Sequence, residues 1–100
     1  MATVYLVDDQ AIVRASFGIW LNQSKQFEII GQNGQARAAI TEIRNLQPDL
    51  ILLDIAMPGL SGLEALPLII DANPGGCVVI VTDFENELFV RQALDGGARG

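Results

Sequence analysis

The sequence predicts a single α/β domain built on a parallel β-sheet. Short apolar runs alternate with segments whose apolar residues recur at helical spacing, which is the pattern of consecutive βα units. The strand candidates are almost wholly apolar, as expected where helices cover both faces of a parallel sheet. The chain has 100 residues, 50% of them hydrophobic, so it fits one domain that can bury a sizeable core.

Four short β-prone runs are the predicted strands. All contain valine, isoleucine or leucine, the residue types that fill buried parallel strands. The runs are TVYLV at 3–7, FEIIG at 27–31, DLILLD at 49–54 and CVVIVT at 77–82. Because right-handed crossovers through helices join consecutive parallel strands, we expect all four in one sheet.

Four segments have the apolar spacing of amphipathic helices. They lie at 10–22, at 36–46, between a cap at Ser61 and the breaker at 73–76, and at 85–94. Trp20 follows the spacing of the first helix, so it is expected in the core or against a further helix. Pro67 falls inside the third helix, where its missing N–H is expected to kink the helix or shift its start.

Composition excludes several classes of function. The net charge is −6 and the pI is about 4.2, whereas nucleic-acid interfaces need basic patches, so direct DNA or RNA binding by this chain is not expected. No apolar run reaches the roughly 20 residues of a membrane span, and Met1 leads into the first strand without a signal-peptide pattern. The single cysteine, Cys77, fits a reducing cytoplasm. With no histidine, a bound metal is expected to have oxygen ligands, which favours Mg2+, Mn2+ or Ca2+.

Polar residues follow three of the four predicted strands. Asp8 and Asp9 follow the first, Asp54 ends the third, and Thr82 and Asp83 come at the end of the fourth. The carboxyl ends of strands in a doubly wound sheet share one edge, so we expect these side chains to meet there. A single Asp after a strand is most often a cap or turn residue, but polar groups at three strand ends point to a shared site.

Such a cluster has a defined chemistry. Neighbouring carboxylates repel one another, and a divalent cation such as magnesium removes the repulsion. Magnesium held by few carboxylates also takes phosphate oxygens, and one acid is then placed to attack phosphorus and form an acyl phosphate. A hydroxyl such as that of Thr82 can donate a hydrogen bond to the incoming phosphoryl group.

The segments LVDDQAIVR, ILLDIAMPGLSGLEAL, VVIVTD and ALDGGARG resemble the receiver domain of two-component response regulators. The resemblance keeps the family's order and spacing from the first strand to Gly100. It implies a flavodoxin-like, doubly wound sheet with strand order 2-1-3-4, which a fifth strand extends in the family. The LVDDQ start and the GARG end are most similar to the LuxR/FixJ-type subfamily, in which a DNA-binding helix-turn-helix domain follows the receiver.

The resemblance also implies roles for the strand-end residues. Asp54 is similar to the aspartate that accepts a phosphoryl group from a sensor histidine kinase. Asp9, Asp54 and the backbone carbonyl of Ala56 match the direct ligands of Mg2+, which Mn2+ can replace. Asp8 matches the acid that helps to hold the metal through water. Thr82 matches the switch hydroxyl that moves toward the phosphoryl group. The implied function is a cytoplasmic phosphoacceptor that controls transcription through a separate C-terminal domain, with weak autophosphatase activity at most.

The chain departs from the family pattern in two respects. The fifth strand and its lysine are missing, so residues 1–100 are expected to be a receiver domain that is incomplete at its C-terminus, without an output domain. Lys25, the only lysine, falls on the opposite side of the sheet from the acids. An edge at the fourth strand and an uncovered first helix predict a homodimer or strand-exchanged oligomer. Asp83 stands where the family usually has a small residue, either as a solvated acid or as a charge that hinders phosphorylation.

Two other functions stay open from the sequence. A pseudo-receiver would use the same fold for phosphorylation-independent interaction or dimerisation, and Asp83 and the missing lysine favour it. A magnesium-dependent phosphatase of the haloacid dehalogenase type also uses a strand-end aspartate, but it needs a second acid two residues later, where this chain has Ala56. The acids together with Thr82 favour the phosphoacceptor.

Overall fold

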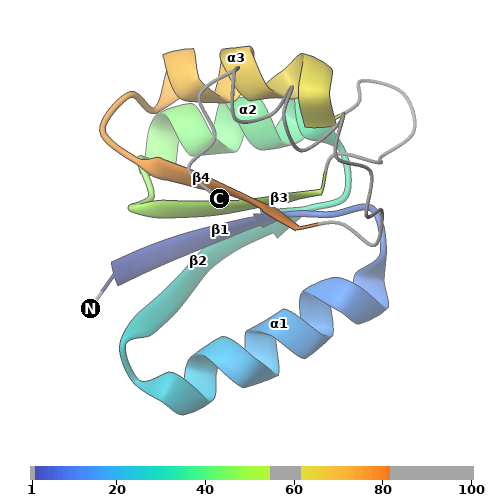
Figure 1. The fold of residues 1–100 in the computed structure, drawn as a ribbon, viewed down its shortest axis with the longest axis vertical. Helices are drawn as coiled ribbons and strands as arrows, with labels where there is room; N and C mark the ends of the chain where they lie inside the picture. The colour runs from blue at the N-terminus through green and yellow to red at the C-terminus, as the bar shows by residue number, and fades with distance from the viewer. Residues whose placement is uncertain (1, 55–61, 82–100) are drawn as a thin grey trace.

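The computed structural model describes residues 2–54 and 62–81, which form strands and helices in alternation (Figure 1). In chain order these are β1 (Ala2–Val7), α1 (Ala11–Ser24), β2 (Phe27–Asn33), α2 (Ala36–Leu46), β3 (Leu50–Asp54), α3 (Gly62–Ala72) and β4 (Cys77–Val81). Each matches a predicted segment to within about two residues at either end. The predicted helix at 85–94, together with Ala56, Ser61, Thr82 and Asp83, lies outside the described residues.

The strands form one parallel sheet in the order β2-β1-β3-β4. This order confirms the doubly wound α/β fold with the expected arrangement 2-1-3-4. Figure 1 shows α1 on one face of the sheet and α2 with α3 on the other. Because all strands run the same way, their carboxyl ends lie at one edge of the sheet, and residues that follow the strands gather there.

Alternate residues of the central strands face the two helical layers. The layer of α2 and α3 encloses the larger core, whose members include Tyr5, Val7, Ile51, Leu53, Ala39, Ile43, Leu66 and Ile69. Val4 and Leu6 lie in a second cluster with Leu21 of α1. Since both faces of these strands are covered, their sequences are continuously apolar rather than alternating.

β2 runs two residues past its predicted end, to Asn33. The register with β1 shifts by one residue between Val4 and Tyr5, so that Tyr5 pairs with Gly31. The Tyr5 ring lies so close to Gly31 that an added Cβ would come within 2.6 Å of it. The irregularity therefore places a glycine beside a buried tyrosine, and pairing resumes to the end of both strands.

α1 buries little of its apolar surface in the described structure. Leu21 is buried and Phe17 packs beside it. Ile12, Ile19 and Trp20 are instead 79%, 65% and 65% exposed. The prediction that Trp20 packs in the core is wrong, because a residue adjacent to Leu21 is rotated by about 100° around the helix axis from the buried side. Packing of Trp20 against a further helix stays a prediction.

α3 begins at Gly62 and passes through Pro67 instead of starting after it. Of the two predicted effects of Pro67, the shift of the helix start is therefore wrong, and the kink stays a prediction. Pro67 is exposed, while Leu66 and Ile69 bury the opposite side against the sheet, and this packing holds the helix across the missing N–H. Like the other helices in the described part of the chain, α3 is not long and apolar enough to cross a membrane.

Candidate functional site

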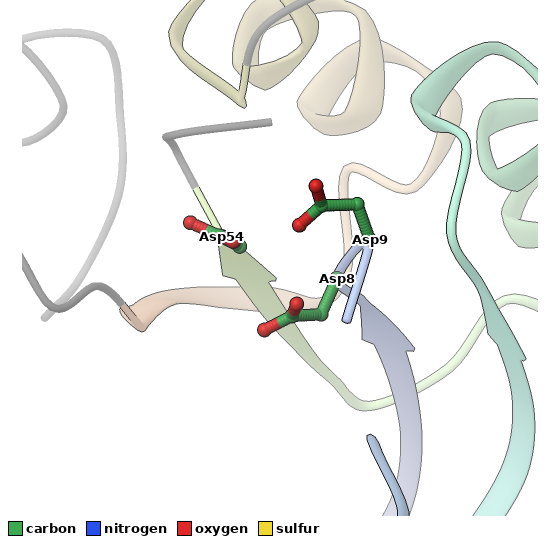
Figure 2. Close-up of side chains that lie close together, drawn as sticks. All are labelled: Asp8, Asp9 and Asp54. Atoms are coloured by element: carbon green, nitrogen blue, oxygen red, sulfur yellow. The ribbon is translucent and has the colours of Figure 1, made fainter. Parts of the chain in front are cut away.

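Three aspartates meet at the carboxyl end of the sheet. One carboxylate oxygen from each of Asp8, Asp9 and Asp54 lies within 4.8 Å of the other two. Figure 2 shows the three side chains around the ends of β1 and β3. The structure thus brings together three of the acids that the sequence assigned to this edge of the sheet, and their individual roles stay predictions.

The pairing of β1 with β3 produces this juxtaposition. Val7 pairs with Leu53 in the ladder. The next residue along each strand is an acid, Asp8 in the first and Asp54 in the second. Val7 and Leu53 are both fully buried, so the two acids project from the ends of strands that the core holds in place.

Asp8 forms hydrogen bonds with three groups in the described part of the chain. Its N–H donates to the carbonyl of Asn33 (3.1 Å), and its Oδ1 accepts from the N–H of Gln10 (2.8 Å). Arg14 of α1 donates from Nη1 to the Asp8 backbone carbonyl. Asp8 is only 8% exposed, whereas Asp9 is exposed. Asp8 is therefore the fixed member of the cluster, and Asp9 is the accessible one.

Asn33 connects the end of β2 to α2. Its Nδ2 donates to Glu42 Oε1 (2.8 Å), which also accepts from the Tyr5 hydroxyl (2.9 Å). The hydrogen bond from Asn33, and then that from Tyr5, lowers the pKa of Glu42. Burial raises the pKa of Tyr5, and Glu42 raises it further. This network was not predicted from the sequence. A tyrosine within an apolar strand is a signal for it, because a buried hydroxyl needs a partner.

The donor set of the cluster suits a hard divalent cation. It consists of carboxylate oxygens, which are the ligands that Mg2+ and Mn2+ prefer. Two unit charges 4.8 Å apart repel by about 1 to 3 kcal/mol at the effective dielectric of a protein surface or of water. A bound cation would replace this repulsion by attraction, so the residues present fit a magnesium ion.

The remaining predicted site residues are placed as follows. Thr82, Asp83 and Ala56 lie outside the described residues, so their contacts with the acids stay predictions. Lys25 follows α1 in a left-handed conformation (φ 60°) and precedes β2. It therefore lies at the amino end of the sheet, away from the acids, as its place in the sequence predicts.

Comparison with known protein families decides what kind of domain carries this cluster. Residues 4–100 match the family model described as the response regulator receiver domain. The chain belongs to this family. The match includes both strands that position the acids, so the three-aspartate cluster is part of a receiver domain, and the resemblance found in the sequence is confirmed.

A curated relative of this receiver domain is considerably longer. The chain is 36% identical over 97 residues to the uncharacterized transcriptional regulatory protein YxjL of Bacillus subtilis. The alignment covers 97% of this chain and 44% of that protein. The receiver domain therefore spans less than half the length of this relative.

Solved structures of response regulators share the fold. A LuxR-family two-component response regulator from Aurantimonas sp. SI85-9A1 superposes with a TM-score of 0.91 at 26% identity, over 98% of this chain and 70% of that one. The CheX–CheY–BeF3–Mg2+ complex from Borrelia burgdorferi gives a TM-score of 0.88 at 25% identity, over 98% and 74% of the two chains. The receiver domain is thus similar to response regulators in both sequence and architecture.

Proposed function

We propose that this receiver domain is a phosphoacceptor whose acceptor residue is Asp54. A carboxylate oxygen of Asp54 attacks the phosphorus of a phosphohistidine on a sensor histidine kinase. The P–N bond breaks, a P–O bond forms, and the imidazole leaves as a neutral ring after taking up a proton. The observation that carries the proposal is the meeting of Asp54 with Asp8 and Asp9 at the end of two paired strands.

The neighbouring acids have a supporting role in this proposal. Mg2+ or Mn2+ would be held by Asp8, Asp9, Asp54 and the backbone carbonyl of Ala56. The ion, when bound, would offset the negative charge of the acceptor and of the incoming phosphoryl group. Thr82 then donates a hydrogen bond from its hydroxyl to the phosphoryl group on Asp54. The rigid strand ends keep the acceptor in place, and the exposure of Asp9 leaves the cluster open to the donor.

The proposed output is control of transcription. The LuxR-family response regulator and the transcriptional regulatory protein described above are longer than this chain and support a separate C-terminal DNA-binding domain. The net charge of −6 makes this receiver domain itself a poor partner for nucleic acid. The proposed setting is the cytoplasm, and the domain is not a turnover enzyme beyond slow loss of its own phosphoryl group.

The deciding experiment is phosphorylation by a small-molecule donor. The chain is incubated with acetyl phosphate and Mg2+, and its intact mass is measured. Addition of one phosphoryl group is expected for the wild type and for Asp49→Asn, which alters the acid just before the same strand. No addition is expected for Asp54→Asn or after chelation of the metal. Equal phosphorylation of Asp54→Asn and the wild type would refute the proposed acceptor.

The same experiment separates the phosphoacceptor from a pseudo-receiver. A folded wild-type chain that takes up no phosphoryl group, alone or from histidine kinases, would favour an interaction module that works without phosphorylation. In the described sheet β4 pairs with β3 alone, which supports self-association as a homodimer or a strand-exchanged oligomer. Light scattering tests this, and a monomer at high concentration would contradict it.

A further inference from the structure

We propose that Arg14 is a positioning residue that fixes the Asp8–Asp9 peptide and thereby the affinity of the acidic cluster for a divalent cation. The proposal rests on the proposed function, because it takes the three aspartates as the cation ligands. Arg14 is absent from the predicted site, and it lies on α1 rather than at a strand end. Its described contact with the site is a hydrogen bond to the backbone carbonyl of Asp8.

The contact fixes a specific part of the backbone. The carbonyl of Asp8 and the N–H of Asp9 belong to one planar peptide unit. Arg14 Nη1 donates to this carbonyl, so it restrains the rotation of the whole unit. The Asp9 side chain extends from the Cα that follows this peptide, so a change in the orientation of the peptide moves the Asp9 carboxylate relative to that of Asp54.

The other restraints on Asp8 do not replace this one. The Asp8 N–H is bound by Asn33, and the Asp8 carboxylate accepts from the N–H of Gln10. Both act on groups other than the carbonyl. The turn also joins the first turn of α1 at Gln10, whose carbonyl accepts from the N–H groups of Val13 and Arg14 (3.1 Å each). The Arg14 side chain adds a bond from α1 to the peptide from which Asp9 extends.

Gly34 lies next to the hydrogen bond between Arg14 and the Asp8 carbonyl. A Cβ added at Gly34 would lie 3.0 Å from Arg14 Nη1, 3.5 Å from the Asp8 carbonyl oxygen and 3.6 Å from Asp9 Cα. The backbone after β2 thus lies directly against both the guanidinium and the acidic turn. A methyl group at this position requires the flexible end of Arg14 to shift by a few tenths of an ångström, whereas its distances to the two backbone atoms are ordinary van der Waals contacts.

Charge and position make opposite predictions for Arg14. A positive guanidinium near the acids repels a second cation, so loss of the charge alone would strengthen metal binding. Loss of the positioning contact would weaken it, because the ligands would then have to be ordered when the metal binds. The direction of the change in affinity therefore reports which effect dominates, and a purely structural role changes stability without changing affinity.

The test measures Mn2+ binding by electron paramagnetic resonance in variants of this chain. Arg14→Gln is expected to raise the Kd for Mn2+ by about tenfold, a typical effect of removing a group that orients a metal ligand. Arg14→Lys, which can offer one N–H donor on a flexible stem, is expected to recover part of the affinity. Gly34→Ala keeps the charge and displaces the guanidinium, and it is expected to weaken binding in the same direction.

The matched control is Arg44→Gln, which removes an equal charge from the exposed last turn of α2. Its Kd is expected to equal that of the wild type. Tighter binding by Arg14→Gln, or an unchanged Kd with a lowered melting temperature, would overturn the proposal. So would wild-type affinity in Gly34→Ala accompanied by a shifted Asp9 amide resonance, because the contact would then be disturbed without any effect on the metal.

A readout in metal-free protein separates this proposal from the proposed function. In Arg14→Gln, but not in Arg44→Gln, the amide resonances of Asp9 and Gln10 are expected to shift, and their amide protons are expected to exchange faster with solvent. This result supports the positioning role even if Asp54 accepts no phosphoryl group. Unchanged resonances together with failed phosphorylation of the wild type would reject both proposals.

Discussion

The two ends of the sheet surround an aspartate with opposite kinds of group, hydrogen-bond donors at the amino end and other carboxylates at the carboxyl end. Asp49 and Asp54 lie at the two ends of β3. At the amino end, Asp49 Oδ2 accepts from the N–H and the hydroxyl of Thr3 (2.8 and 3.1 Å). These hydrogen bonds, that from the N–H first, lower the pKa of Asp49. At the carboxyl end, Asp54 is instead placed among two like charges.

The amino end is a set of complementary hydrogen bonds. Asn73, 4% exposed, donates from Nδ2 to the carbonyl of Pro48 (2.8 Å), and Gln47 Nε2 donates to the carbonyl of Ala72 (2.7 Å). These donors each meet an acceptor, and the resulting hydrogen bonds stabilise the fold. The carboxyl end differs from the amino end because its carboxylates carry like charges. The stability of the carboxyl end therefore depends on what binds there.

The largest expected effect is at the amino end. A Cβ at Gly76 would lie 2.4 Å from Asn73 Nδ2 and 2.8 Å from the Pro48 carbonyl oxygen. Gly76→Ala is therefore expected to separate this buried hydrogen-bonded pair and to lower the free energy of unfolding by about 3 kcal/mol. Urea denaturation measures the change.

The control is the neighbouring glycine. A Cβ at Gly75 meets no atom within 4 Å, so Gly75→Ala is expected to change the free energy of unfolding by less than about 0.5 kcal/mol. Equal effects of the two substitutions would show that the amino end does not depend on the contact between Asn73 and Pro48. Folded Gly76→Ala is expected to keep the wild-type phosphorylation of Asp54, because the change lies at the other end of the sheet.

An intermediate effect is expected from metal at the carboxyl end. Mg2+ at ten times its Kd is expected to raise the free energy of unfolding of the wild type by about 1.4 kcal/mol, because it binds the folded chain alone. Asp9→Asn removes one ligand charge and is expected to lose most of this gain. Asp49→Asn is expected to retain it, and thermal melts with and without chelator distinguish these outcomes.

The smallest effect is the contribution of Asp49, at the amino end, to the pH dependence of the free energy of unfolding. Because the pKa of Asp49 is lowered in the folded state, its contribution to stability is present above the ordinary aspartate value of 3.8 and is lost as pH falls through the folded value. Asp49→Asn removes this dependence, so its free energy of unfolding is expected to fall less steeply than that of the wild type on acidification. Asp71→Asn, which removes an exposed acid of α3, is the control. Parallel pH curves for Asp49→Asn and the wild type would contradict the assignment.

The strand order and the meeting of the acids could be predicted from the sequence. Buried parallel strands leave continuous apolar runs, and the carboxyl-end rule then brings Asp8 and Asp54 to one edge. The last part of β2 could not be predicted in this way. Gln32 and Asn33 are polar, and they belong to the strand because their backbone groups pair with β1.

The contacts that support the site could not be predicted from the sequence either. Arg14 acts on a backbone carbonyl, and such an acceptor exists at every residue, so its choice depends on the tertiary fold. Trp20 shares the helical spacing of buried residues, but the orientation of α1 on the sheet decides which side is covered. Apolar spacing predicts that a helix has a buried side, and only packing fixes which residues form it.

The pairing of β1 with β3 also has a consequence for folding. Asp8 and Asp54 are 46 positions apart in the chain, and α1, β2 and α2 lie between their strands. During synthesis the first acids emerge long before the third, and closure of so long a loop is slow compared with helix formation. The cluster cannot exist until this non-local contact has formed. Binding of a divalent cation during refolding would therefore report the time at which β1 and β3 join, independently of the appearance of helices.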